Sequence, residues 1–253
     1  MDFTVTRSIQ TIDAPQHTFY RNRITAKHLI PFSVVIKETD LLIFAERPLE
    51  EEVIEAVLHY RHHLEEYIST SPDFARSLVP LPPDEYAPPF IREMLHASHR
   101  AQVGPMASVA GALAEQVGND LLEHTPNVIV ENGGDLFLKV SEDLTIGIYA
   151  GSSPLSNKLA LKIPAAMTPL GVCTSSGTVG HSLSFGRSDA VTILAHSTPL
   201  ADATATAVGN HVKGTQDIAK GLDYAQTIEG ILGTLIIVDD QFGAWGAIEI
   251  IPT

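Results

Sequence analysis

The sequence is poor in several kinds of residue, and each shortage excludes a structural feature or a kind of binding partner. Its single cysteine, Cys173, excludes an intramolecular disulfide. Only 16 lysine and arginine residues stand against 30 aspartate and glutamate residues, and the formal net charge is −14. Nucleic acid and anionic membrane surfaces attract basic proteins, and no apolar run reaches the ~18 residues of a membrane-spanning helix. We therefore expect neither nucleic acid nor membrane as a partner.

The N-terminal stretch MDFTVTRSIQ lacks the basic segment and the apolar segment of a secretory signal. Together with the shortage of cysteine, this predicts a cytoplasmic protein. The chain has 253 residues, of which 44% are hydrophobic, so it is long enough to bury one large core. We expect a single domain over residues 1–253.

Strand and helix patterns follow one another without the strict β-α-β order of a parallel sheet, which predicts an α+β fold with mixed or antiparallel sheets. Helices are predicted at residues 49–69, 90–101, 105–122, 199–212 and 216–232. Strands are predicted at residues 17–23, 32–39, 41–47, 144–151, 158–163, 191–195, 234–240 and 244–252, and a hairpin at residues 127–140. The first strands are expected to turn at Thr39 and Asp40.

Two of the predicted helices, 105–122 and 199–212, consist largely of small residues, and both carry Val-Gly-Asn near their ends. This pattern suggests two similar halves packed face to face. The apolar segment TLIIVDD at 234–240 suits either an inner strand or the edge of a homodimer.

The segment from Thr70 to Pro89 is rich in proline, serine and acidic residues. Proline disfavours helix, while Phe74, Leu78 and Tyr86 supply apolar anchors that a disordered segment would lack. We expect an ordered loop near the functional site, and neither a helix nor a flexible linker.

The densest stretch of chemically useful residues is GVCTSSGTVGHSLSFGRSDAVTILAHSTPLADATATAVGN, at 171–210. Its TSSGTVG segment reads as a loop whose amides can turn toward a phosphate or another anion. Asp202 and Thr206 are four residues apart near the start of a predicted helix, which places their oxygens on one face. Asp202 can equally be a structural acceptor that caps N–H groups of the loop.

Cys173 and His181 are the candidate catalytic residues of this stretch. Cys173 can act as a nucleophile or a persulfide carrier if nearby amides stabilise its thiolate, or it can be a small buried hydrophobe. His181 can serve as a general acid or base, because imidazole titrates near neutral pH, or it can be a solvated loop residue.

A histidine-rich segment, HYRHH at 59–63, is interpreted as a solvated helix face. A zinc site uses histidines that are oriented by acidic neighbours, and His59, His62 and His63 lack such neighbours in the adjacent sequence.

Several motifs together resemble the ApbE superfamily of FAD:protein FMN transferases. The Gly-Gly-Asp of 133–135, the Ser-Gly loop at 176–177, the strand at 191–195 and ADATATA at 201–207 occur in that family's order. ETDL at 38–41, VGPMASVAGALAE at 103–115, VENGGD at 130–135 and SSGTVGHS at 175–182 are similar to an uncharacterised ApbE-like branch of anaerobic bacteria and methanogens. The resemblance covers nearly the whole chain.

The resemblance implies a site for FAD or FMN and for magnesium. Carried over by position, the magnesium ligands are Asp202, Thr206 and the backbone carbonyl near Ala112. Magnesium prefers hard oxygen ligands and completes its shell with water and phosphates, so a sparse set is chemically sensible. The flavin-contacting residues are implied to be Asn132, Gly133, Gly134, Asp135, Thr174, Ser175, Ser176 and Gly177, together with Gly111 of the glycine-bearing helix.

The chain also departs from the active transferases. They carry a His-Ile-x-Asp-Pro-x-Thr-Gly segment where this sequence has GHSLSFGRSDA, and their Lys-Gly pair reads Ala110-Gly111 here, with Glu115 in place of an aspartate. Those groups activate and orient the diphosphate, so the resemblance implies nucleotide binding more directly than FMN transfer.

Two alternatives remain open at this stage. The uncharacterised branch is associated with sulfur assimilation and homocysteine formation, which implies a sulfur-handling protein that uses Cys173 with a donor or acceptor protein. The other alternative is a scaffold that keeps the fold without the chemistry.

Overall fold

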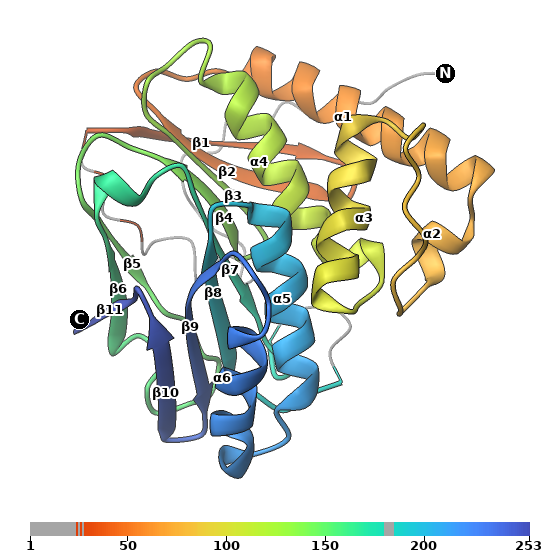
Figure 1. The fold of residues 1–253 in the computed structure, drawn as a ribbon. Coiled ribbons are helices and arrows are strands. Elements are labelled where there is room, and N and C mark those ends of the chain that lie inside the picture. Colours follow the sequence, from red (N-terminus) through yellow and green to blue (C-terminus); the bar gives the residue numbers. More distant parts are fainter. Residues whose placement is uncertain (1–23, 25, 27, 180–184) are drawn as a thin grey trace.

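The computed structural model describes residues 24, 26, 28–179 and 185–253 (Figure 1). The strand predicted at 17–23 lies outside the described residues. Among those that are described, no helix is both long enough and apolar enough to span a membrane.

An eight-stranded sheet forms the centre of the molecule, and every neighbouring pair of its strands is antiparallel (Figure 1). The strands are, in spatial order, β1 (Ile30–Ile36), β2 (Thr39–Ala45), β3 (Val128–Asn132), β4 (Asp135–Lys139), β7 (Leu170–Ser175), β8 (Ala190–Ala195), β9 (Ile231–Val238) and β10 (Gln241–Gly246).

A second sheet covers one face of the large one. It has three antiparallel strands, β11 (Glu249–Pro252), β6 (Leu159–Ile163) and β5 (Leu144–Gly147). The alternation of side chains along a strand explains how the large sheet supports a layer on each face. On β7, Val172 packs in the cluster that faces this second sheet, whereas the next residue, Cys173, packs in the cluster that faces the helices.

The helices lie on the other face of the large sheet (Figure 1). They are α1 (Glu50–Thr70), α2 (Asp73–Arg76), α3 (Pro89–Ala101), α4 (Val109–Leu121), α5 (Thr198–His211) and α6 (Ile218–Gln226). Helix α1 has Glu50, Glu51 and Glu52 in its first turn, where the helix dipole favours acids. The hydroxyl of Ser197 accepts a hydrogen bond from the Leu200 amide and is the N-cap of α5.

The α+β class with antiparallel sheets is confirmed, and most predicted elements are present. The first hairpin turns at Lys37 and Glu38, because β1 pairs Ile36 with Thr39, so the predicted turn at Thr39 and Asp40 was wrong. The helix predicted at 105–122 opens as a 3₁₀ turn, η2 (Pro105–Ser108), before α4 begins. The helix predicted at 216–232 is η4 (Thr215–Asp217) followed by α6, and it ends earlier than predicted.

The C-terminal strand predicted at 244–252 is in fact two strands that belong to different sheets. Gly246, with φ 86°, separates β10 from β11. A side chain there would place its Cβ 2.2 Å from the Leu232 carbonyl oxygen, so only glycine permits this bend.

The first five residues of the segment TLIIVDD belong to β9, which lies between β8 and β10. Its residues Leu235, Ile236 and Ile237 are fully buried because both faces of the strand are covered. The alternative that this segment forms the edge of a homodimer was therefore wrong, since its hydrogen-bonding edges are already used.

The proline-rich segment from Thr70 to Pro89 contains a short helix, α2, so the prediction that this segment forms no helix was wrong. Phe74 of this helix is fully buried, and its ring packs edge-on against Tyr67 of α1 with 5.1 Å between the ring centroids. The segment thus lies along α1 and α3, and α2 exists because one aromatic anchor reaches the core.

Candidate functional site

A two-residue turn between β3 and β4 presents the first acidic group of the site. Gly133 and Gly134 have φ angles of 66° and 108°, which L residues with side chains rarely adopt. Asn132 and Asp135 are paired across the hairpin, and the Gly134 amide donates to the Glu131 carboxylate at 2.8 Å. The predicted hairpin turn is present, and it holds Asp135 at the first position of β4.

Strand pairing places Asp135 directly opposite Cys173 of β7. The Asp135 residue is 8% exposed, and Cys173 is fully buried. Burial raises the pKa of Asp135 well above its usual value, and the nearby negative charge of Asp202 raises it further. A buried acid therefore lies beside a second acid that comes from a helix.

That second acid is part of the α4–α5 junction, which we define as Gly111, Glu115, Thr198 and Asp202. The Asp202 carboxylate of α5 accepts the Gly111 amide of α4 at 2.9 Å, and the Glu115 carboxylate of α4 accepts the Thr198 amide of α5 at 2.5 Å. Both amides belong to first helical turns, whose N–H groups have no partner within their own helix. Each helix thus caps the start of the other.

The two helices approach closely because Gly111 has no side chain. A Cβ at this position would lie 2.7 Å from the Thr198 carbonyl oxygen and 2.8 Å from the Asp202 Cβ. The small residues that the sequence analysis singled out in both helices therefore serve this close contact.

The protonation of Asp202 reflects two opposing effects. Burial raises its pKa to about 7, while hydrogen bonds from the amides of Gly111 and Ala110 lower it. No lysine or arginine of the described residues forms an ion pair with Asp135 or Asp202. The carboxylate pair consequently lacks a balancing positive charge from the described part of the chain.

Asn132 links the hairpin turn to α4, because its side-chain amide donates to the Ala110 carbonyl oxygen at 3.1 Å. The structure therefore brings together Asn132, Asp135, Cys173, Gly111 and Asp202, which come from four separate segments of the sequence. These five residues form one candidate site between the sheet and the α4–α5 junction.

The segment predicted as an anion-binding loop is partly a strand, and several of its amides already have acceptors. Thr174 and Ser175 are the last residues of β7, not part of a loop, and the Thr174 hydroxyl lies 2.9 Å from that of Thr192. The hydroxyl of Ser176 accepts from the amides of Thr178 and Val179 at 3.1 and 3.0 Å.

The amide of Gly177 is also used, because it donates to the Ser188 carbonyl oxygen at 2.9 Å. A Cβ on Gly177 would lie 2.5 Å from the Gly186 carbonyl oxygen, so glycine is required there for close packing of the chain. Three amides of this loop therefore already have acceptors within the protein.

Three further residues were predicted to take part in the site: Thr206, Ala112 and His181. Thr206 is half-buried one turn beyond Asp202 on α5, and its hydroxyl forms no hydrogen bond with a described residue. Ala112 is fully buried within α4, where a backbone carbonyl normally accepts the amide four residues later. His181 lies outside the described residues.

Sequence reasoning missed the roles of Glu115 and Ser188. Glu115 was noted only as a departure from a motif, and its partner Thr198 is 83 residues away. The Ser188 hydroxyl is buried and has no partner among the described residues. A Cβ on Gly209 would lie 3.7 Å from the Ser175 Oγ atom and 3.8 Å from the Ser188 Oγ atom, so these two serines flank the far end of α5.

As a metal site, the candidate site has few protein ligands. Within the described part of the chain, no group of three or more His, Cys, Asp or Glu side chains is placed to hold a metal ion. Asp202 and Thr206 supply oxygen atoms on one helix face, which suits an ion that draws most of its ligands from water and phosphate.

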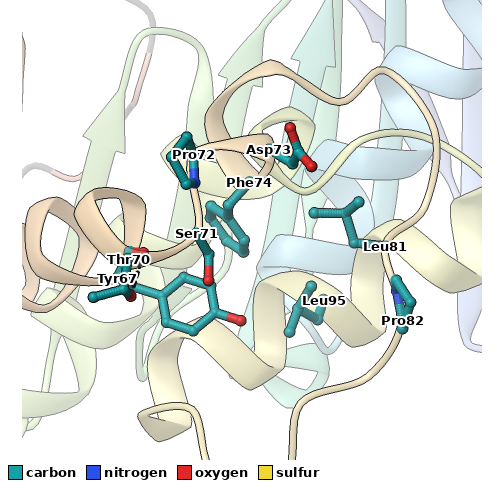
Figure 2. A pocket seen from close by; sticks show the side chains of 9 residues that line it. All are labelled: Tyr67, Thr70, Ser71, Pro72, Asp73, Phe74, Leu81, Pro82 and Leu95. Carbon is teal, nitrogen blue, oxygen red and sulfur yellow. Dashed lines mark hydrogen bonds between the residues drawn. The ribbon is translucent and has the colours of Figure 1, made fainter.

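A separate pocket of about 310 Å³ lies between the end of α1, α2 and α3 (Figure 2). Figure 2 shows Phe74 and Leu95 at its apolar wall and the Tyr67 ring at its rim. It is lined by Tyr67, Thr70, Ser71, Pro72, Asp73, Phe74, Leu81, Pro82 and Leu95. None of the predicted site residues lines this pocket.

Comparison with solved structures finds the same fold. The flavinyl transferase ApbE of Pseudomonas stutzeri, in its apo form, matches with a TM-score of 0.57 at 15% identity, covering 86% of this chain and 93% of that one. A mutant of the flavin transferase ApbE from Vibrio cholerae matches with a TM-score of 0.52 at 12% identity, covering 87% and 97%. At these identities the likeness concerns the fold.

Sequence relatives are much closer. A UPF0280 protein of Methanocaldococcus jannaschii is 41% identical over 227 residues, which is 87% of this chain and 92% of that protein. A UPF0280 protein of Methanothrix thermoacetophila is 43% identical over 196 residues, or 76% and 81% of the two chains. The family model described as AbpE bacteria matches residues 21–239, and the chain therefore belongs to this uncharacterised ApbE-like family.

Proposed function

We propose that the protein binds FAD, FMN or another diphosphate-containing nucleotide together with magnesium, between the β3–β4 hairpin and the α4–α5 junction. One observation carries the proposal. The carboxylates of Asp135 and Asp202, from a strand and a helix, lie close enough to shift the pKa of Asp135, and no basic side chain of the described residues pairs with either. A divalent cation is a chemical partner that can balance the charge of such a pair when both acids are ionised.

The residues present fit magnesium in part. The Asp202 carboxylate accepts the Gly111 amide through one oxygen, and the Thr206 hydroxyl lies on the same helix face as this carboxylate. The Ala112 carbonyl fits less well, because it lies inside α4. Bound magnesium would neutralise the carboxylates and the nucleotide diphosphate.

FMN transfer is not part of the proposal. The solved neighbours are named flavin or flavinyl transferases, and their likeness to this chain is one of fold. This chain lacks the His-Ile-x-Asp-Pro-x-Thr-Gly segment of the active enzymes. Nucleotide binding needs only the hairpin, the close helix pair and the acids, all of which are present.

The sulfur-carrier alternative finds no support at Cys173. The residue is fully buried, and its thiol lies 3.4 Å from the Thr198 carbonyl oxygen. Burial raises the pKa of the Cys173 thiol well above its usual range, and the charges of Asp135 and Asp202 raise it further. A persulfide carrier needs an accessible thiolate, and this environment opposes both access and ionisation.

Calorimetric titration tests the proposal. FAD, FMN and ADP are titrated into the wild-type protein with and without magnesium, and then into Asp202→Asn. We expect magnesium-dependent binding of FAD and ADP, and a loss of about tenfold or more in Asp202→Asn because a metal ligand has lost its charge.

The matched control is Asp223→Asn, an acid-to-amide change at an exposed position of α6. It changes the net charge equally and should leave binding unchanged. The proposal is wrong if the wild type binds none of the nucleotides, or if Asp202→Asn binds them as the wild type does.

A further inference from the structure

We propose that His59 and His63, on the outer side of α1, form a binding site for a divalent transition-metal ion such as Zn²⁺, Ni²⁺ or Cu²⁺. The two residues are four apart, so they lie on the same face of the helix. Their ring centroids are 4.3 Å apart and their planes meet at 64°. Two imidazoles at this separation can direct one nitrogen each toward a shared ion.

Two acidic groups lie near the histidines of α1, contrary to the expectation from the adjacent sequence. Asp120 of α4 lies within electrostatic reach of His59, and it accepts a hydrogen bond from the Tyr60 hydroxyl at 3.1 Å. Glu66 lies 3.8 Å from the His62 ring. Negative charge near histidine ligands stabilises a bound cation.

The arginine that lies between the two histidines in sequence is held by other partners. Arg61, between the two histidines in sequence, donates to the Thr39 hydroxyl at 2.8 Å and to Glu38 at 2.7 Å. Its charge is therefore held toward the β1–β2 hairpin by two partners and by Glu65.

The imidazole ligands determine which metal ions can bind, and the number of protein ligands determines the affinity. Imidazole nitrogens favour zinc, nickel and copper, whereas magnesium requires oxygen ligands, so this site is distinct from the one proposed between β4 and α5. No third His, Cys, Asp or Glu among the described residues completes a metal cluster. Water must fill the remaining positions, which makes the ion exchangeable, in contrast to the four-ligand sites that hold structural zinc.

The test is a calorimetric titration of the full chain, freed of metal by a chelator and carrying no polyhistidine tag, with Zn²⁺, Ni²⁺ and Cu²⁺ chlorides. We expect a saturable binding event that weakens about tenfold or more in His59→Gln and in His63→Gln, because each variant loses one of two protein ligands. Magnesium should neither bind there nor displace the transition ion.

His62→Gln is the matched control, since this residue is on the same helix, its ring centroid is 6.4 Å from that of His63, and its ring lies 3.8 Å from the Glu66 carboxylate. It should leave the affinity within about twofold, because a histidine that only contributes charge nearby is not a ligand. Electron paramagnetic resonance of the copper complex should show nitrogen ligands that are lost in His59→Gln and His63→Gln. The proposal is overturned if the two variants bind zinc as tightly as the wild type, or if His62→Gln weakens binding as much as they do.

Discussion

Two helices of this protein carry polar pairs at the same four-residue spacing. One pair lies on a packed helix and the other on a helix at the outside of the helical layer. Asp202 and Thr206 lie on α5, whose small side chains pack between the large sheet and α4. His59 and His63 lie on α1, at the outside of the helical layer, where His59 is exposed and His63 is half-buried.

The four-residue spacing determines which helix face each pair occupies, whereas the surrounding atoms determine its protonation and its accessibility. Helical periodicity puts each pair on one side of its helix. On α5 the neighbours are backbone amides and another buried acid, and the pKa of Asp202 rises to about 7. On α1 the neighbours are solvent and other side chains, so the histidines remain accessible to a soluble ion. Three substitutions sharpen this contrast.

The largest effect is expected from Gly111→Val at the α4–α5 junction. Its side chain would collide with the Thr198 carbonyl and with Asp202, both part of well-packed helices. Forcing the helices apart should lower the free energy of unfolding by about 3 kcal/mol, as overpacking does. Denaturant titration measures this change.

Gly214→Val is the control for that prediction, because a Cβ on Gly214 meets only the flexible end of Gln216. It should cost far less than Gly111→Val. Equal losses in the two variants would show that the close helix contact is not what stabilises the junction.

A smaller, pH-dependent effect is expected from Asp202→Asn. The carboxyl titrates near pH 4 in the unfolded chain and at a pKa of about 7 in the folded protein, so the folded state binds more protons between these values. Wild-type stability should therefore rise as the pH falls from 7 toward 4. The variant should be more stable than the wild type above pH 7, and this advantage should shrink steadily as the pH falls toward 4.

Thermal unfolding of both proteins at several pH values measures the crossover. A constant difference between the two proteins from pH 5 to pH 8 would show that Asp202 has an ordinary pKa in the folded state.

The smallest effect is expected on the stability of α1. His59→Gln should change the free energy of unfolding by less than about 0.5 kcal/mol in the absence of metal, because an exposed helix position makes few contacts. Urea titration of the metal-free protein provides this value. A loss above 1 kcal/mol would place His59 in the structural framework, in contradiction to its exposed position.

Sequence reasoning found much of the candidate site because several of its signals are local. Asn132, Gly133 and Gly134 indicate a tight turn by residue type alone, and the small-residue segment at 199–212 indicates a helix. The error at Thr174 and Ser175 has a local cause as well, since serine and threonine favour loops on average. Pairing with β4 and β8 made them the end of a strand instead.

The α+β class, the positions of most strands and helices, and the face of each polar pair can be predicted from the sequence, because they depend on side-chain periodicity within a few residues. Folding alone brings Asp202 to a helix start 91 residues away, encloses Cys173 and places Asp120 within electrostatic reach of His59. The reason is physical. Burial, pKa and capping depend on atoms brought close by folding, and such contacts leave no periodic pattern in the chain.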